Sequence, residues 1–155
     1  MPNPLYDALF APLATREGPV LLLADGTSLS GQGLHALIAR LAGALRAAGV
    51  VPGDRVAVQV AKSPEALALY AATTSIGAVF LPLNTAYTAE ELAYFIGHAT
   101  PRLFVCDPAK TEALAPVAEA GGARLLTLGA DGAGTLANLA AGQPAQFVPE
   151  SCEAG

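Results

Sequence analysis

The feature that most constrains this chain is the alternation of short apolar segments with longer helical segments between residues 55 and 128. A strand buried on both faces of a parallel sheet is a nearly continuous apolar run, and a helix between two such strands returns the chain for parallel pairing. We therefore expect an α/β fold, with a mostly parallel sheet and helices on both faces. The expected strands are residues 55–61, 78–81, 103–106 and 124–128.

Helix start signals lie between these strands. Residues 63–65, Ser-Pro-Glu, combine a capping side chain, a proline in the first turn and an acid near the positive helix end. Residues 88–91, Thr-Ala-Glu-Glu, form a capping box, in which Thr and the second Glu satisfy each other's backbone N–H groups. The pair Asp-Pro at 107–108 starts a further helix, and a short helix is expected at residues 135–141.

An N-terminal helix and a β-hairpin are expected before the sheet. Asn3 can cap a short helix that runs through Ala11. Residues 19–29 are predicted to form a hairpin, because Asp-Gly at its centre favours a tight turn. A long helix over residues 30–49 begins at a serine cap and ends at a glycine that suits the left-handed conformation.

The low charge of the chain needs an explanation. Only 14% of its 155 residues are charged, against about 25% in typical domains, and the mean hydropathy is +0.46. A membrane span or apolar faces covered by other polypeptide would each explain these values. The uncharged stretch 66–89 contains Gly77, Pro82 and Asn84, whose turn chemistry interrupts a membrane helix. We therefore expect no membrane segment, and apolar faces that other polypeptide covers.

Charge and cysteine content exclude other classes. The chain has 8 Lys and Arg against 13 Asp and Glu, and no basic run. Nucleic-acid binding is excluded, because it requires several cations on one face. Cys106 and Cys152 make no disulfide framework, and the N-terminus lacks a signal peptide's basic start and apolar run. These features favour the cytoplasm.

Two glycine motifs resemble phosphate-binding loops. Residues 31–36 fit G-x-G-x-x-A, the dinucleotide fingerprint, and Asp54 follows about twenty residues later. The motif follows a polar hairpin rather than a buried strand, and Asp54 precedes the next strand instead of closing it, so a flexible helix start is favoured. Residues 132–137 fit the same G-x-G-x-x-A pattern, but no strand is expected after them. A small dinucleotide-binding module that uses Gly31 and Gly33 remains an alternative.

The sequence predicts no catalytic residue and no metal site. His35, His98, Cys106 and Cys152 are scattered, without the spacing of metal ligands. We expect both histidines to be structural or exposed, and Cys106 to be a buried apolar residue rather than a nucleophile.

Polar loops follow two of the expected strands. They are residues 81–88 and 107–110, and Lys110 is their only cation. Ligands of open parallel sheets bind beyond the carboxyl ends of the strands, so these loops lie on the side where a ligand would bind. Turn and cap residues with a solvated lysine would give the same pattern.

The stretch from Val50 to Lys110 resembles the N-terminal region of adenylate-forming acyl-CoA synthetases, the AMP-binding superfamily. The specific parts are GDRVAV, GAVFLPLNTAYT and LFVCDP, and PLNTAYTAEELAYFI is most similar to malonyl-CoA synthetases. The resemblance extends from about Leu5 to Gly142. One departure is residues 29–34, which replace the family's [ST]-Y-x-E-L segment and leave the local packing there open.

The resemblance implies an incomplete N-terminal subdomain of an AMP-binding fold. Residues 1–142 would form this subdomain, and residues 143–155 would link it toward the family's phosphate loop, T-S-G-T-T-G-x-x-K-G, which the chain lacks. Such enzymes convert a carboxylate and ATP into an acyl-adenylate, from which coenzyme A displaces AMP. ATP, Mg²⁺ and coenzyme A are implied for the parent enzyme, and this chain alone is expected to be inactive.

The resemblance also implies a site residue and partners. In some relatives the region of residues 107–110 carries cations near the nucleotide phosphate of coenzyme A, and Lys110 is the matching candidate. The partners would be the rest of the ligase and a malonate-like acid, with self-association through uncovered apolar faces. A non-catalytic interaction module remains the other alternative.

Overall fold

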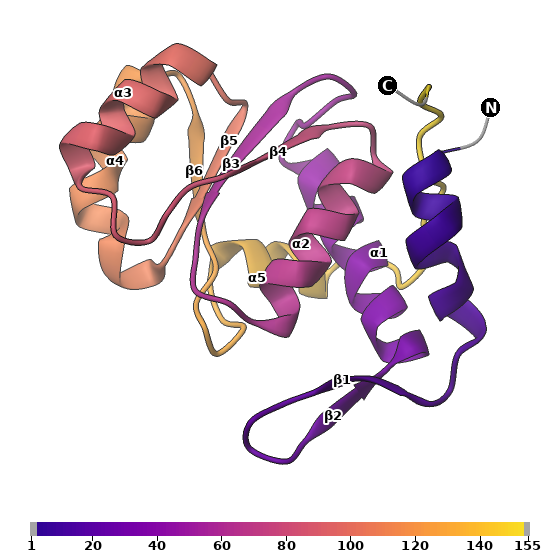
Figure 1. The fold of residues 1–155 in the computed structure, drawn as a ribbon. Helices are drawn as coiled ribbons and strands as arrows, with labels where there is room; N and C mark the ends of the chain where they lie inside the picture. Colours follow the sequence, from indigo (N-terminus) through magenta and orange to yellow (C-terminus); the bar gives the residue numbers. More distant parts are fainter. Residues whose placement is uncertain (1–2, 154–155) are drawn as a thin grey trace.

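The computed structural model describes residues 3–153 and contains a four-stranded, fully parallel sheet (Figure 1). The two central strands are flanked on each side by one edge strand. This arrangement confirms the predicted parallel α/β fold, with strand ends within two residues of the expected ones. In spatial order the strands are β4 (Val79–Pro82), β3 (Arg55–Gln59), β5 (Leu103–Cys106) and β6 (Arg124–Thr127).

Helices cover both faces of the sheet, as expected (Figure 1). One layer also packs against the N-terminal segment, whereas the other consists of two helices, one before β5 and one after β5 and a short 3-10 turn, η3 (Pro108–Lys110). The first layer contains α1 (Gly31–Ala47), α2 (Pro64–Ser75) and α5 (Thr135–Ala141), and the second contains α3 (Ala89–Ala99) and α4 (Thr111–Ala120). Within residues 3–153 no helix is long and apolar enough to cross a membrane.

Strand β5 supplies side chains to both layers. All four of its residues are buried. Leu103 and Val105 belong to the core under α1, α2 and α5, whereas Phe104 and Cys106 belong to the core under α3 and α4. Successive side chains of a strand point to opposite faces, so a continuous apolar run is needed to fill both cores.

The predicted helix caps are present. The hydroxyls of Ser30 and Ser63 each accept from a backbone N–H three residues on, at 3.0 Å. Thr88 Oγ1 accepts from the Glu91 N–H at 3.3 Å, and a Glu91 carboxylate oxygen accepts from the Thr88 N–H at 2.8 Å, which confirms the capping box. Gly49, with φ of +90°, ends the turn after α1. These local bonds fix where the helices begin and end.

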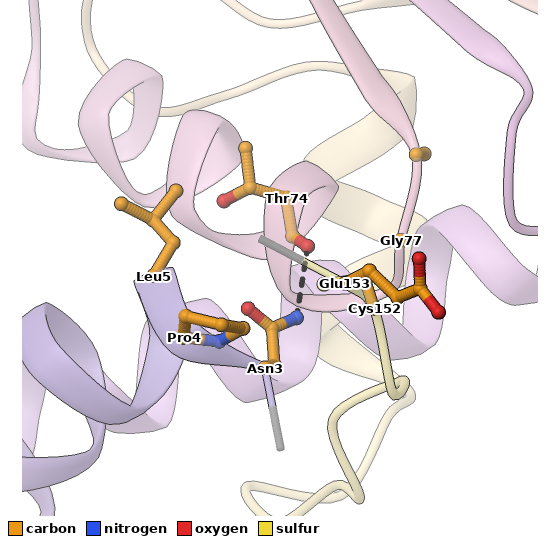
Figure 2. A pocket seen from close by; sticks show the side chains of 8 residues that line it. Asn3, Pro4, Leu5, Thr74, Gly77, Cys152 and Glu153 are labelled. Carbon is orange, nitrogen blue, oxygen red and sulfur yellow. Dashed lines mark hydrogen bonds between the residues drawn. The ribbon is translucent and has the colours of Figure 1, made fainter. Parts of the chain in front are cut away.

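The N-terminal helix is less regular than expected. It consists of a π-helical turn, η1 (Tyr6–Phe10), and a 3-10 turn, η2 (Ala11–Thr15). Pro12 has no N–H, so a regular α-helical ladder cannot continue through it. Asn3 still caps this segment, because its Oδ1 accepts from the Tyr6 N–H at 3.1 Å, and its Nδ2 donates to the carbonyl oxygen of Thr74 at 3.2 Å (Figure 2).

The predicted hairpin is confirmed as a separate two-stranded antiparallel sheet. Its strands are β1 (Pro19–Leu22) and β2 (Ser28–Ser30). Asp25 closes the turn by accepting from the Thr27 N–H at 2.9 Å. In Figure 1 the hairpin extends away from the main sheet below α1.

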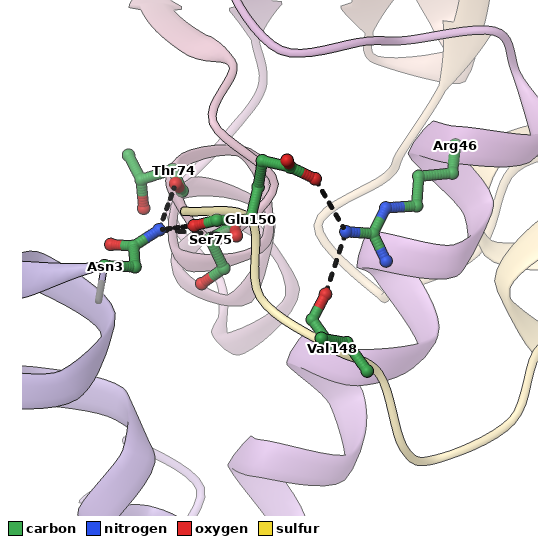
Figure 3. A network of polar contacts seen from close by, with 6 residues as sticks. All are labelled: Asn3, Arg46, Thr74, Ser75, Val148 and Glu150. Carbon is green, nitrogen blue, oxygen red and sulfur yellow. Dashed lines mark hydrogen bonds and ion pairs between the residues drawn. The ribbon is translucent and has the colours of Figure 1, made fainter. Parts of the chain in front are cut away.

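Residues 143–153, which we call the tail segment, contain no helix or strand and cross α1 and α2 near the chain's N-terminus (Figure 3). The Glu150 N–H donates to the Ser75 carbonyl oxygen at 2.8 Å, and Asn3 Nδ2 donates to the Glu150 carbonyl oxygen at 3.1 Å. Arg46 donates to the Val148 carbonyl oxygen at 2.8 Å and pairs with the Glu150 carboxylate at 3.8 Å. The tail segment is thus joined to the C-terminal ends of α1 and α2.

Replacing Asn3 by alanine should lower the free energy of unfolding by about 2 kcal/mol, because four backbone groups (the Tyr6 N–H and the carbonyl oxygens of Thr74, Ser75 and Glu150) would lose a hydrogen-bond partner. Asn138→Ala on the exposed side of α5 is the matched control, with an expected change of less than about 0.5 kcal/mol. Urea unfolding followed by circular dichroism measures both. Equal midpoints for the two variants would show that Asn3 does not hold the termini together.

Candidate functional site

Polar side chains converge where β3, β4 and β5 end, a region that we call the carboxyl edge. Lys110 closes the 3-10 turn after β5, and its Nζ donates to the Thr85 carbonyl oxygen at 2.8 Å and to Gln59 Oε1 at 3.3 Å. Thr85 lies in the loop after β4, and Gln59 is the last residue of β3. The two predicted loops, 81–88 and 107–110, are therefore in direct contact through Lys110.

Gln59 connects the loop after β4 with Lys110 at this edge. Its residue surface is only 1% exposed, and its Nε2 donates to the carbonyl oxygens of Asn84 at 2.8 Å and Tyr87 at 3.3 Å. The Asn84 side chain in turn accepts from the Ala86 N–H at 2.9 Å, which forms a turn within the same loop. Sequence reasoning missed Gln59. Its only signal was a polar residue within an otherwise apolar run.

The local sequence places Lys110 at the rim. Asp107 Oδ1 accepts from the Ala109 N–H at 2.8 Å, and the Thr111 hydroxyl donates to the Pro108 carbonyl oxygen at 2.8 Å. These bonds fix the turn on both sides of Lys110, whose side chain is half-buried. An ammonium group has three N–H donors, and two of them contact Thr85 and Gln59. The arrangement thus holds a cation in place with a third donor for an anion such as a phosphate.

Residues 31–36 do not form a phosphate cradle. The N–H groups of residues 31, 32 and 33 donate to Gly18 O at 3.1 Å, Arg16 O at 2.9 Å and Ser30 Oγ at 3.0 Å. A Cβ on Gly31 would lie 2.6 Å from the Arg16 Cβ, so glycine allows this close approach of the preceding segment. The donors that a dinucleotide would need are used by the protein itself. This packing also accounts for the segment that departs from the family pattern.

The second glycine motif, residues 132–137, also has polar groups that are paired within the protein. Thr135 Oγ1 accepts from the Thr127 N–H at 2.9 Å, and the Thr135 N–H donates to Thr127 Oγ1 at 2.9 Å. Gly134 lies against the Thr127 carbonyl group, where a Cβ would not fit. This motif joins β6 to α5 and leaves no space for a phosphate beside Gly134.

His35 has a structural role and His98 is exposed, which agrees with the expectation that each is one or the other. The His35 Nε2 lies 2.9 Å from the Tyr6 hydroxyl, and its ring is 6.3 Å from that of Phe147. Burial lowers the pKa of His35 below its usual value, and burial, with a smaller contribution from Asp7, raises the pKa of Tyr6. His98 is exposed and stacks on Tyr94. Among residues 3–153, no group of three His, Cys, Asp or Glu could hold a metal ion.

A cavity of about 320 Å³ lies between the N-terminal segment, the end of α2 and the tail segment (Figure 2). Its lining is Asn3, Pro4, Leu5, Thr74, Gly77, Ala78, Cys152 and Glu153. Gly77 and Ala78 precede β4, so the cavity lies at the amino end of the sheet, opposite the carboxyl edge. Ligands of open parallel sheets bind at the other end, and the lining holds no cation for a phosphate. The carboxyl edge is therefore the better candidate site.

Residues 11–152 match the family model described as "AMP-binding enzyme". The chain belongs to the AMP-binding enzyme family. It superposes on apo MatB from Rhodopseudomonas palustris, a malonyl-CoA synthetase, with a TM-score of 0.93 and 44% identity. The match covers 99% of this chain and 30% of MatB, and ATP-bound MatB gives the same values. An acyl-CoA synthetase from Brucella canis matches at 26% identity and a TM-score of 0.72, over 83% of this chain and 25% of that one.

Curated relatives agree on the family. An acetoacetyl-coenzyme A synthetase from Rhizobium meliloti (strain 1021) is 41% identical over 75 residues, and a feruloyl-CoA synthase from Amycolatopsis is 39% identical over 93 residues. These matches cover 48% and 60% of this chain, but only 12% and 19% of the relatives. The chain therefore spans a small part of the proteins that it matches.

Cys106 should resist a disulfide reagent in the folded chain, whereas the half-exposed Cys152 should react. Burial, followed by the nearby Asp107 carboxylate, raises the pKa of the Cys106 thiol to about 11. At pH 8 about one Cys106 in a thousand is then a thiolate. A chromogenic disulfide reagent should label one thiol quickly, and both after unfolding in guanidinium. Cys152→Ser should abolish the fast reaction; two fast thiols in the native protein would contradict the burial of Cys106.

Proposed function

We propose that this chain is the N-terminal subdomain of an ATP-dependent ligase that resembles malonyl-CoA synthetase and acts in the cytoplasm. Residues 1–142 form the subdomain, and residues 143–155 lead toward the phosphate-loop region of the parent ligase. The single observation that carries this proposal is the similarity to MatB, at 44% identity over 99% of the chain. No comparable observation favours a dinucleotide-binding or interaction module, since the helix start at residues 31–33 has its donors paired.

The proposed reaction has two steps. A carboxylate oxygen bonds to the α-phosphorus of ATP and pyrophosphate leaves, and the thiolate of coenzyme A then bonds to the acyl carbon while AMP leaves. Residues 3–153 contain no cluster of acidic or other ligands that would hold Mg²⁺. We therefore assign ATP, Mg²⁺ and the acid to the remaining polypeptide of the parent ligase.

This chain's own contribution is a scaffold and one ligand contact. We assign Lys110 to the nucleotide phosphate of coenzyme A. Its Nζ is already oriented by Thr85 and Gln59, and a positive charge at the carboxyl edge of the sheet attracts a phosphate monoester. The isolated chain offers, among residues 3–153, no reactive thiol at the carboxyl edge, because Cys106 is buried there and its pKa is raised. It is therefore expected to be inactive without the rest of the ligase.

Exposed apolar side chains fit a subdomain that other polypeptide covers. Leu22 on the hairpin is 82% exposed and Leu67 on α2 is 41% exposed, and both line one shallow cavity. Tyr94 on α3 is 70% exposed on the opposite side of the sheet. Burial of such surfaces is favourable, so we expect the rest of the ligase to cover them and the isolated chain to self-associate.

The parent ligase should form a thioester from malonate, ATP and coenzyme A, and form it faster than from aliphatic monoacids. The isolated chain of 155 residues should form none. A coupled assay for AMP, with the thioester identified by mass spectrometry, measures both. Absence of product with every acid would defeat the proposed function, and turnover by the isolated chain would defeat the assignment of the chemistry to other polypeptide.

Lys110→Met in the parent ligase should raise the KM for coenzyme A about tenfold, because one charge-assisted phosphate contact is lost. The matched control is Lys62→Met, since Lys62 is an exposed lysine that follows β3 at the same edge. The control should leave the KM for coenzyme A within about twofold of the wild-type value. Equal effects of the two substitutions would show that Lys110 acts only as general surface charge.

A further inference from the structure

We propose that Gln59 is a positioning residue for coenzyme A, acting through Lys110 without touching the ligand itself. This inference rests on the proposed function, because it presupposes that Lys110 binds the nucleotide phosphate. It arises from one observation: a fully buried amide is bonded at one end to the cation of the carboxyl edge and at the other end to the loop after β4.

Gln59 is itself fixed in the folded chain. It ends a central strand whose backbone pairs with strands on both sides, and it lies opposite Cys106 of β5. Its residue surface is 1% exposed, and both polar atoms of its amide have partners. A side chain with this burial and these bonds is held in one rotamer, so it can serve as a fixed reference point for mobile neighbours.

Gln59 determines the positions of both acceptors to which Lys110 is bonded. Its Oε1 accepts one Nζ–H directly at 3.3 Å. Its Nε2 holds the carbonyl groups of Asn84 and Tyr87, which flank Thr85, the other acceptor for Lys110. Lysine has a flexible four-carbon stem, and fixing it costs conformational entropy. Because Gln59 already fixes the Lys110 side chain in the folded chain, this entropy is lost before the ligand binds.

An amide suits position 59 better than a carboxylate or an apolar side chain. A carboxylate at residue 59 would pair with the ammonium of Lys110 and offset the charge that attracts the phosphate. An apolar side chain would leave the carbonyl groups of Asn84 and Tyr87 without their donor. Glutamine supplies donors for the loop and an acceptor for the lysine while it remains neutral. It orients the cation without cancelling its charge.

The experiment compares coenzyme A with 3′-dephospho-coenzyme A, which lacks the phosphate monoester, in the parent ligase. Gln59→Met should raise the KM for coenzyme A about fivefold and leave kcat and the KM for the dephospho form within about twofold. Lys110→Met should give at least the same change. The double variant should be no worse than Lys110→Met alone, because Gln59 acts through that lysine. A purely structural role for Gln59 would instead change both substrates equally and add to the effect of Lys110→Met.

The possible outcomes separate the role of Gln59 from the Lys110 contact and from the proposed function. An unchanged KM in Gln59→Met, with a raised KM in Lys110→Met, would overturn the role of Gln59 and leave the Lys110 contact intact. If Lys110→Met leaves the ratio of the KM values for coenzyme A and 3′-dephospho-coenzyme A unchanged, the ligand contact itself is overturned. If the wild-type ligase forms no thioester, the proposed function is overturned. If circular dichroism shows that Gln59→Met is unfolded, Gln59→Glu decides. This variant keeps an acceptor for Lys110, and it should raise the KM for coenzyme A but not the KM for the dephospho form. A KM for coenzyme A equal to the wild-type value would refute the proposal.

Discussion

The burial of strand β5 from both sides is the constraint on which the rest of this structure depends. Its four residues alternate between two cores, so neither helix layer can pack unless β5 is central and parallel to its neighbours. A central parallel strand requires helical crossovers before and after it, which α3 and α4 with η3 provide. The same requirement brings the ends of β3, β4 and β5 to one edge, where Gln59, Thr85 and Lys110 meet.

The contacts that join the termini and the candidate site lie at opposite ends of the sheet. The first helix layer, the N-terminal segment and the tail segment are joined by hydrogen bonds of the Asn3 side chain and the Glu150 backbone at the amino side of the sheet. The carboxyl edge carries the oriented cation. The potential nucleophile, Cys106, and the glycine-rich helix start at residues 31–33 are both enclosed by the protein's own packing. The proposed contribution of the chain to ligand binding is therefore one phosphate contact at Lys110, within a framework whose exposed apolar surfaces other polypeptide would cover.

Sequence reasoning succeeded where the determining interactions are short-range. The caps at Ser30, Ser63 and Thr88 act within three residues, and the alternation of apolar runs predicts the parallel sheet without knowledge of tertiary contacts. It failed where partners are distant. Gln59 contacts residues 25 to 51 positions away, and Asn3 contacts Glu150 at a separation of 147. No local pattern encodes such pairs. The family resemblance supplied Lys110 but not the amide that orients it.

A crystal structure of the parent ligase with coenzyme A bound would test the central claim most directly. The account predicts that Lys110 Nζ lies about 3 Å from an oxygen of the nucleotide phosphate while it keeps its bonds to Gln59 and Thr85. A phosphate held by other residues, with Lys110 bonded only to Gln59 and Thr85 as it is here, would contradict the account.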